Sequence, residues 1–273
     1  MSWKTIRAGL LVLLIIVNLA LFWMNRLEQD RLYLVKDKDL RQVLELYEQN
    51  NIVVESVLYK ESYPRAPILL GDADYLSPEM VERFLGADYR IVYMDGQQRQ
   101  YTKGDETILL DPVNHRLVYT LQLSEGRKWS RERLKAWSAS KVEECLEGGD
   151  VHWVCTEEKE GEWIYVQERD GEYLYFNRAI IKMSDTDSVV LEISYYEPLK
   201  YMKQTREVRP LDELMYGAMK TIIQRGDSES HVVTQIRHGY DLDASLQSVY
   251  CLEFVLANGR TVRINAYTNE VIN

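Results

Sequence analysis

The chain lacks the short motifs that most often carry enzymatic chemistry. Its 273 residues contain no phosphate-binding loop of the Walker type, no GxSxG nucleophile turn, no HExxH zinc motif and no glycine-rich dinucleotide-binding turn. These absences argue against the common nucleotide-dependent, serine-hydrolase and zinc-peptidase classes. We therefore predict a protein that is not an enzyme, with no catalytic residues, no cofactor and no metal site.

Cysteine and histidine are also scarce. The three cysteines, Cys145, Cys155 and Cys251, form no CxxC pair, and the 4 histidines are scattered. Cys145 and Cys155 could bridge a helix end to the next strand, or all three could be small buried apolar residues. His231 and His238 lie at positions that would place them on opposite faces of a strand, so we predict no shared metal.

One spacing does suggest an enzyme. Ser138 and Lys141 form an S-x-x-K pattern, and one turn of helix would bring the lysine next to the serine hydroxyl, as a Ser–Lys acyl-transfer nucleophile requires. The companion K-T-G and S-D-N elements are absent, and a two-residue pattern arises easily in a chain with 33 basic residues. We interpret this pair as part of a helix surface.

Basic runs and low-complexity segments are absent as well. The formal net charge is -10, and a polyanion of this size is repelled by phosphate polymers and by anionic lipid headgroups. This charge argues against binding of nucleic acid or of a membrane surface by the folded part. No small-molecule substrate is predicted either.

The chain does have one long apolar segment, from Ile6 to Met24. Between Ala8 and Met24 it carries no charge and only one strongly polar residue, Asn18. About 20 helical residues span a hydrocarbon core of ~30 Å. We predict a single transmembrane anchor within residues 1–30; the alternatives are a buried core helix and a cleaved signal peptide.

Asn18 makes this helix a candidate binding surface. A side-chain amide in hydrocarbon needs a partner, and a hydrogen bond to a neighbouring helix contributes ~0.6–2 kcal/mol. The alternative is that Asn18 merely tolerates its position. The candidate partner-binding residues share the face of Asn18: Leu11, Leu14, Ile15, Asn18 and Phe22.

Beyond the apolar segment, the sequence alternates between helical and strand patterns. Helices are predicted at residues 30–51, 77–85 and 130–147, and from Pro210 to just before Gly226. Strands are predicted at 52–59, 89–94, 99–103, 107–110, 116–121, 151–156, 163–169, 173–177, 189–196, 232–236, 249–256, 261–266 and 271–272.

Each of these helices precedes strands, and three precede a full antiparallel meander. We therefore predict an α+β fold in which repeated helix-plus-antiparallel-sheet units follow the single transmembrane helix. The 19 tyrosines are typical of half-buried sheet surfaces. A division near residues 124–127 gives three parts: the cytoplasmic tip and anchor at 1–30, a first unit at 31–125 and a second unit at 126–273.

Several segments match a known pattern in the same order along the chain. They are Trp3-Lys4 before the apolar helix with Asn18-Leu19, the helix-to-strand join at 40–52, the helix at 77–85, and the closing strands at 253–271. Together they resemble the YycI family of membrane-anchored regulators of an essential sensor histidine kinase. The family closes on an N-A-x-T-G-E signature, and this chain has Asn269 at its glycine position. Asparagine tolerates a left-handed turn, so we expect the hairpin to survive.

The resemblance implies a location and partners. It implies a single-pass protein in the cell membrane, with a cytoplasmic N-terminus and an extracytoplasmic domain, although basic residues alone do not orient the anchor. It also implies contacts through transmembrane helices with a YycH-like protein and with a WalK/YycG-like sensor histidine kinase. The function expected from it is accessory regulation of a two-component system.

The closing hairpin is also similar to PepSY-type domains. That similarity implies a different function, an exported ligand-binding or protease-inhibiting module. A chain starting at Arg31 should then bind its target alone, whereas regulation through the anchor predicts that such a chain is largely inactive.

Overall fold

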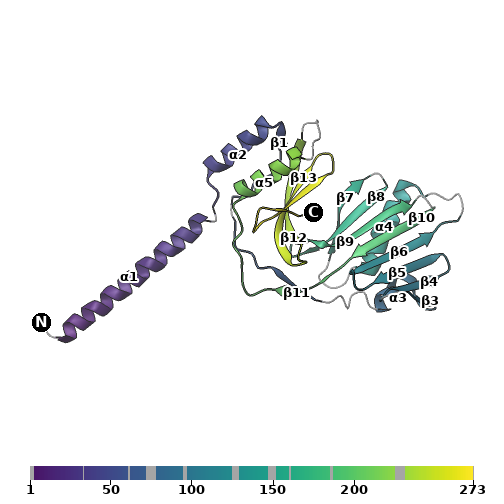
Figure 1. Ribbon diagram of the computed structural model, residues 1–273, viewed down its shortest axis with the longest axis horizontal. Helices are drawn as coiled ribbons and strands as arrows, with labels where there is room; N and C mark the ends of the chain where they lie inside the picture. Colours follow the sequence, from purple (N-terminus) through teal and green to yellow (C-terminus); the bar gives the residue numbers. More distant parts are fainter. Residues whose placement is uncertain are drawn as a thin grey trace.

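The computed structural model describes residues 3–32, 34–60, 62–71, 78–94, 97–124, 129–146, 152–159, 161–184, 187–224 and 231–272. Its helices are α1 (Trp3–Leu32), α2 (Asp37–Gln49), α3 (Pro78–Leu85), α4 (Arg131–Leu146) and α5 (Leu211–Gln224) (Figure 1). Its strands are β1 (Ile52–Val54), β2 (Ile68–Gly71), β3 (Arg90–Tyr93), β4 (Arg99–Lys103), β5 (Glu106–Asp111), β6 (Arg116–Gln122), β7 (His152–Lys159), β8 (Glu162–Arg169), β9 (Glu172–Ser184), β10 (Ser188–Ser194), β11 (Glu197–Tyr201), β12 (His231–Leu242), β13 (Ser248–Leu256), β14 (Thr261–Asn265) and β15 (Val271–Ile272).

Helix α1 extends away from the folded part of the chain (Figure 1). Its large apolar side chains between Leu10 and Met24 are all exposed. In the part of the chain that is described, no helix has both the length and the apolar content needed to cross a membrane. The predicted fold class included a single transmembrane helix, and this part of the prediction is wrong.

Most strands belong to one mixed sheet of 13 strands, in the order β15-β14-β13-β12-β9-β10-β6-β5-β4-β3, with β1, β7 and β8 joined beside this path. Strand β10 pairs antiparallel with β6, whereas β12 pairs in parallel with β1 and with β9. The predicted repeated α+β units are therefore wrong, because strands far apart in the sequence share one mostly β architecture. The division of the chain into parts at 1–30, 31–125 and 126–273 stays a prediction.

Two large buried clusters fill this architecture, beside a small third one of Val166, Tyr175 and Cys251. The C-terminal core lies between α2, α5 and the strands β12 to β14, and the central core lies between α3, α4 and the strands β4 to β10. Helix α5 contributes Leu211, Leu214, Met215, Ala218 and Ile222 to the C-terminal core, which confirms the apolar stripe expected after Pro210. Burial of this stripe fixes which face of α5 meets the sheet.

The closing hairpin forms as expected. Asn269 has a φ of 64°, in the left-handed region, and β14 pairs with β15 through Arg263↔Ile272 and Ile264↔Val271. The side-chain Nδ2 of Asn269 donates to the Glu213 carbonyl at 3.0 Å, which ties the hairpin to α5. The prediction that asparagine supports this turn is confirmed.

The S-x-x-K spacing does not give a Ser–Lys contact. Ser138 is fully buried, and its Oγ donates to the Lys135 carbonyl at 2.8 Å and lies 3.0 Å from Tyr165 Oη. Lys141 Nζ instead donates to the Phe84 carbonyl at 3.2 Å. Both polar groups hold the central core together, so the interpretation of Ser138 as helix surface is wrong.

Candidate ligand-binding pocket

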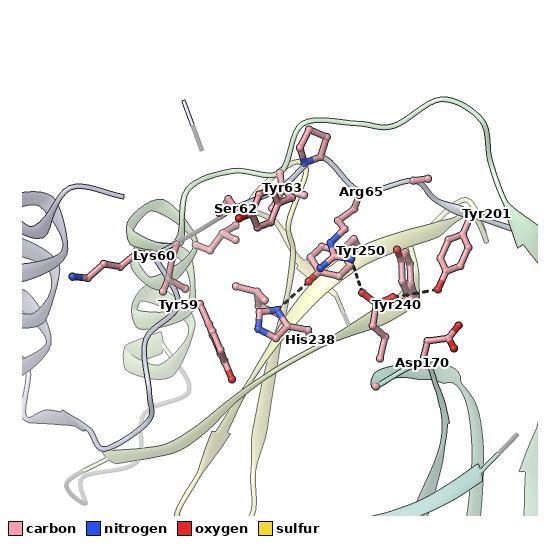
Figure 2. A pocket seen from close by; sticks show the side chains of 18 of the residues that line it. Tyr59, Lys60, Ser62, Tyr63, Arg65, Asp170, Tyr201, His238, Tyr240 and Tyr250 are labelled. Atoms are coloured by element: carbon pink, nitrogen blue, oxygen red, sulfur yellow. Dashed lines mark hydrogen bonds and ion pairs between the residues drawn. The ribbon is translucent and has the colours of Figure 1, made fainter. Parts of the chain in front are cut away.

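A pocket of about 1060 Å³ lies over β12 and β13, next to the first turn of α5 (Figure 2). One wall is a connecting segment that we call the strap, residues 58–60 and 62–66. The turn between β8 and β9 and Tyr201 of β11 form the remaining walls, and the first turn of α5 contributes to the floor. The pocket therefore combines side chains from segments that are far apart in the sequence.

The strap is fixed by backbone hydrogen bonds at both ends. Val35 N donates to the Lys60 carbonyl at 2.9 Å. Arg65 and Arg206 exchange two backbone hydrogen bonds of 3.0 and 2.9 Å, and Tyr267 Oη donates to the Arg65 carbonyl at 3.1 Å. The backbone at Arg65 is therefore well positioned before any ligand arrives.

The Arg65 side chain points from the strap toward Tyr250 (Figure 2). Its guanidinium carbon lies 5.1 Å from the centre of the Tyr250 ring, and its Nη1 lies 3.0 Å from Glu172 Oε1. Tyr201 Oη donates to the other oxygen of Glu172 at 3.3 Å. The Arg65 side chain is 40% exposed and that of Glu172 only 14%, so the arginine is the accessible member of the pair.

His238 lies beside this arginine. Its Nδ1 is 3.0 Å from Tyr250 Oη, and its ring meets Tyr59 edge-on at 4.7 Å (Figure 2). Burial, and then the charge of Arg65, lower the pKa of His238, while burial raises the pKa of Tyr250. At neutral pH Tyr250 is therefore the donor and the neutral His238 ring is the acceptor at Nδ1.

Tyrosines form the polar wall of the pocket. Tyr240 packs edge-on to Tyr250 at 5.3 Å, and Tyr201 lies 6.0 Å from Tyr240. Burial raises the pKa of both Tyr201 and Tyr240, so their hydroxyls remain protonated. The apolar floor consists of Leu58, Val208, Leu211, Leu214 and Leu252.

The polar groups of the pocket have defined protonation states and partners. The hydroxyls of Tyr201, Tyr240 and Tyr250 are protonated, because burial raises the pKa of each, and His238 accepts a hydrogen bond from Tyr250. In the described ranges, no three or more His, Cys, Asp or Glu residues are grouped so that they could hold a metal ion, and Cys155 and Cys251 are free thiols. Tyrosine and arginine around an apolar floor are typical of recognition sites.

The residues predicted as a site lie elsewhere. Leu11, Leu14, Ile15, Asn18 and Phe22 are all exposed on α1 and do not line the pocket. Their role as partner contacts stays a prediction.

The pocket was not predicted from the sequence, although the sequence contains one signal of it. His238 and Tyr240 alternate along β12, and Tyr250 and Leu252 alternate along β13, which places each pair on one sheet face. The alternation predicts a polar-aromatic strip, but it does not predict that the strap lies across it.

The fold and the pocket define only a broad class: a mixed β-sheet protein with packed helices and a tyrosine-rich binding pocket. No family model matches the chain, and no curated protein matches it. Two solved structures are similar at low identity. The Bacillus megaterium YpeB C-terminal domain has a TM-score of 0.37 and 12% identity, covering 75% of this chain and 96% of that chain. An uncharacterized protein from Eubacterium rectale has a TM-score of 0.43 and 11% identity, covering 82% of this chain and 91% of that chain.

Proposed function

We propose that the chain is a non-catalytic, exported binding module whose pocket takes an extended segment of polypeptide. The observation that carries this proposal is Arg65, which is held between Tyr250 and Glu172 above an apolar floor. A volume of about 1060 Å³ lies at the upper end of the range for small-molecule sites, which leaves room for several residues of a peptide. Tyrosine and arginine also dominate the binding energy of protein interfaces.

Selection from a random peptide library displayed on phage, with the full chain in detergent micelles as bait, tests this proposal. Enriched peptides should bind the unaltered chain and lose roughly tenfold or more in affinity with Tyr59→Ala, because Tyr59 forms part of the pocket wall. Tyr216→Ala is the matched control, since Tyr216 is similarly exposed on α5 and does not line the pocket. Failure to enrich any peptide, or equal binding to Tyr59→Ala, contradicts the proposal.

The finer proposal concerns regulation. We infer that this binding serves a two-component system, with the chain acting as an accessory regulator beside a sensor histidine kinase and a YycH-like protein at the cell membrane. The YycI-like segments support this inference, and the exposed apolar side chains of α1 offer a surface for such partners. Location of the folded part outside the cytoplasm belongs to the same proposal.

Co-purification with the kinase tests the role of α1. Asn18→Leu should reduce the amount of kinase recovered, because it removes the only strongly polar side chain between Ala8 and Met24 and with it any hydrogen bond from Asn18 to the partner. Leu13→Ala is the control, since Leu13 lies outside the predicted face. Undiminished recovery with Asn18→Leu would remove this residue from the mechanism.

A further inference from the structure

The guanidinium of Arg65 uses only part of its hydrogen-bonding capacity within the protein. Glu172 contacts Nη1, and Tyr250 lies against the face of the group. Among the residues that the structure describes, Nε and Nη2 have no hydrogen-bond acceptor. These two nitrogens project parallel N–H groups from one edge of the planar guanidinium, and this is the fork that a carboxylate accepts with both oxygens.

The fork is fixed in place. The backbone of Arg65 is bonded to Arg206 and Tyr267, and its side chain is held between Glu172 and Tyr250. Little side-chain entropy is therefore lost when an anion binds, which favours recognition by this residue. Figure 2 shows Arg65 entering the pocket from the strap, whereas Lys60 points away from the tyrosine wall.

The charges around the fork favour a ligand group with a single negative charge. Lys60 is paired with Asp37 at 2.6 Å, and Arg65 is already balanced by Glu172. Asp170 also lines the pocket, and its carboxylate is balanced by Arg169, whose Nε lies 3.9 Å from Oδ2. A phosphate dianion would bring two negative charges next to Glu172, with Arg65 as its cation, so a monocarboxylate fits the local charge better.

The pocket floor indicates what adjoins that carboxylate. Leu58, Leu211, Leu214, Val208 and Leu252 line the same pocket as Arg65. Burial of an apolar group on this floor is favourable by about 25 cal/mol per Å² of surface removed from water. The ligand should therefore carry an apolar group next to its charge.

We propose that the pocket recognises a carboxylate adjoining an apolar group, as at the C-terminus of a peptide that ends in aliphatic residues, with the carboxylate accepted by Nε and Nη2 of Arg65. This inference rests on the proposed binding function and specifies its ligand. A fatty acid carries the same two chemical groups, and the experiment separates the two sources.

Ligand-observed NMR titration of the full chain in detergent micelles tests the inference with four probes. They are N-acetyl-leucyl-leucine, the same dipeptide with a C-terminal amide, decanoate and inorganic phosphate. The free-acid dipeptide should bind roughly tenfold or more tightly than the amide, because the amide cannot accept a bidentate, charge-assisted pair of hydrogen bonds. Phosphate should not compete with it at equal concentration.

Three variants connect this preference to the fork. Arg65→Gln should abolish the difference between acid and amide, and Arg65→Lys should retain only part of it, because lysine keeps the charge without the planar fork. Glu172→Gln should tighten binding of the acid about threefold, since a competing negative charge is lost while an amide oxygen remains to accept from Nη1. A merely structural role for the ion pair predicts weaker binding in all three variants.

Arg116→Gln is the matched control. Arg116 forms a comparable partly exposed ion pair with Glu192 at 2.9 Å and does not line the pocket, so binding should be unchanged. Far-UV circular dichroism checks that each variant is folded, and Arg65→Lys keeps the test decisive if Arg65→Gln unfolds.

The outcomes distinguish the two proposals. Equal binding of acid and amide to a pocket that still binds selected peptides overturns the carboxylate inference and leaves the binding function intact. Binding of decanoate but of no peptide supports recognition of a carboxylate and overturns the polypeptide ligand. Absence of binding by every probe and every selected peptide overturns both proposals. Competition by phosphate for the pocket overturns the carboxylate inference.

Discussion

The two large cores of this protein both pack helices against the sheet, but they differ in how much of the sheet face the helices cover. In the central core, α3 and α4 pack against strands whose large side chains, such as Trp163 and Tyr119, are fully buried. In the C-terminal core, α5 begins at Leu211, and the strap, rather than a helix, passes over the rest of the β12–β13 face. The pocket lies where helical cover ends.

Polar groups show what this difference means. In the central core, Ser138 meets Tyr165 and Lys141 meets a backbone carbonyl, so these partners are supplied within the fold. In the pocket, part of Arg65 has no partner among the described residues. Ser138 and Lys141 contribute to the stability of the closed core, whereas the incompletely covered face leaves part of Arg65 available for recognition.

The largest effect should come from opening the closed core. Trp163→Ala should lower the free energy of unfolding by about 3–5 kcal/mol, because Trp163 is fully buried and its removal leaves a cavity. Tyr59→Ala in the pocket wall, where Tyr59 is 48% exposed, should cost less than about 1 kcal/mol. Urea denaturation followed by circular dichroism measures both, and equal losses would contradict the distinction between the cores.

The next effect should come from the contact between β12 and β9, where the two halves of the sheet, β15 to β12 and β9 to β3, meet. A Cβ at Gly239 would meet the Tyr173 carbonyl oxygen and Tyr175 Cε2, the latter at 2.5 Å, so Gly239→Ala should destabilise the protein by about 1–3 kcal/mol. Gly9→Ala is the control, because nothing lies near the added atom. A thermal midpoint unchanged by Gly239→Ala would show that β12 and β9 can separate without cost.

A smaller effect should come from the polar contact that packs α2 on α5. Tyr47 Oη donates to the Met215 carbonyl at 2.6 Å in a buried position. Tyr47→Phe should lower the free energy of unfolding by about 1 kcal/mol, since one buried acceptor loses its donor. Denaturant titration of Tyr216→Phe, whose hydroxyl is at an exposed surface position, should give no measurable change.

The smallest effect should be a pH dependence of the pocket. The pKa of His238 is lowered in the folded state, first by burial and then by Arg65, so protonation favours the unfolded chain. Its contribution to stability is present above its ordinary pKa and is lost as pH falls below about 6.5, at no more than ~1.4 kcal/mol per pH unit. The difference between the unaltered chain and His238→Gln should therefore shrink on acidification. A constant difference from pH 8 to 5 would contradict this assignment.

Local patterns were enough to predict much of the secondary structure. The helices α2 to α5 lie close to their expected positions, because apolar residues recur with helical spacing, as in Leu40, Val43 and Tyr47 of α2. Pairing between distant strands was not predictable in this way. The β8–β9 ladder contains a register shift at Val166/Gln167, and the β12–β13 ladder contains one at Val233/Gln235; neither irregularity has a short-range signature.

The candidate site was less predictable than the fold. Tyrosines were expected on half-buried sheet surfaces only as a group, whereas Tyr240 lies beyond the strand predicted at 232–236 and both Tyr240 and Tyr250 are buried. Their role depends on a strap that approaches from more than a hundred residues earlier in the chain. Arg65 gave no sequence signal, because its importance comes from Glu172 and Tyr250, which only the folded chain brings together.

The parallel contact between β12 and β9 is short, with Gly239↔Tyr173 and Tyr240↔Leu174 as its two matched positions. Glu172 immediately precedes this contact, and Tyr240 belongs to it. The Arg65–Glu172 pair therefore bridges the line along which the halves of the sheet meet. Any rotation of one half of the sheet against the other must change the distance between Arg65 and Glu172. Binding of a ligand in the pocket is therefore coupled to the angle between the two halves.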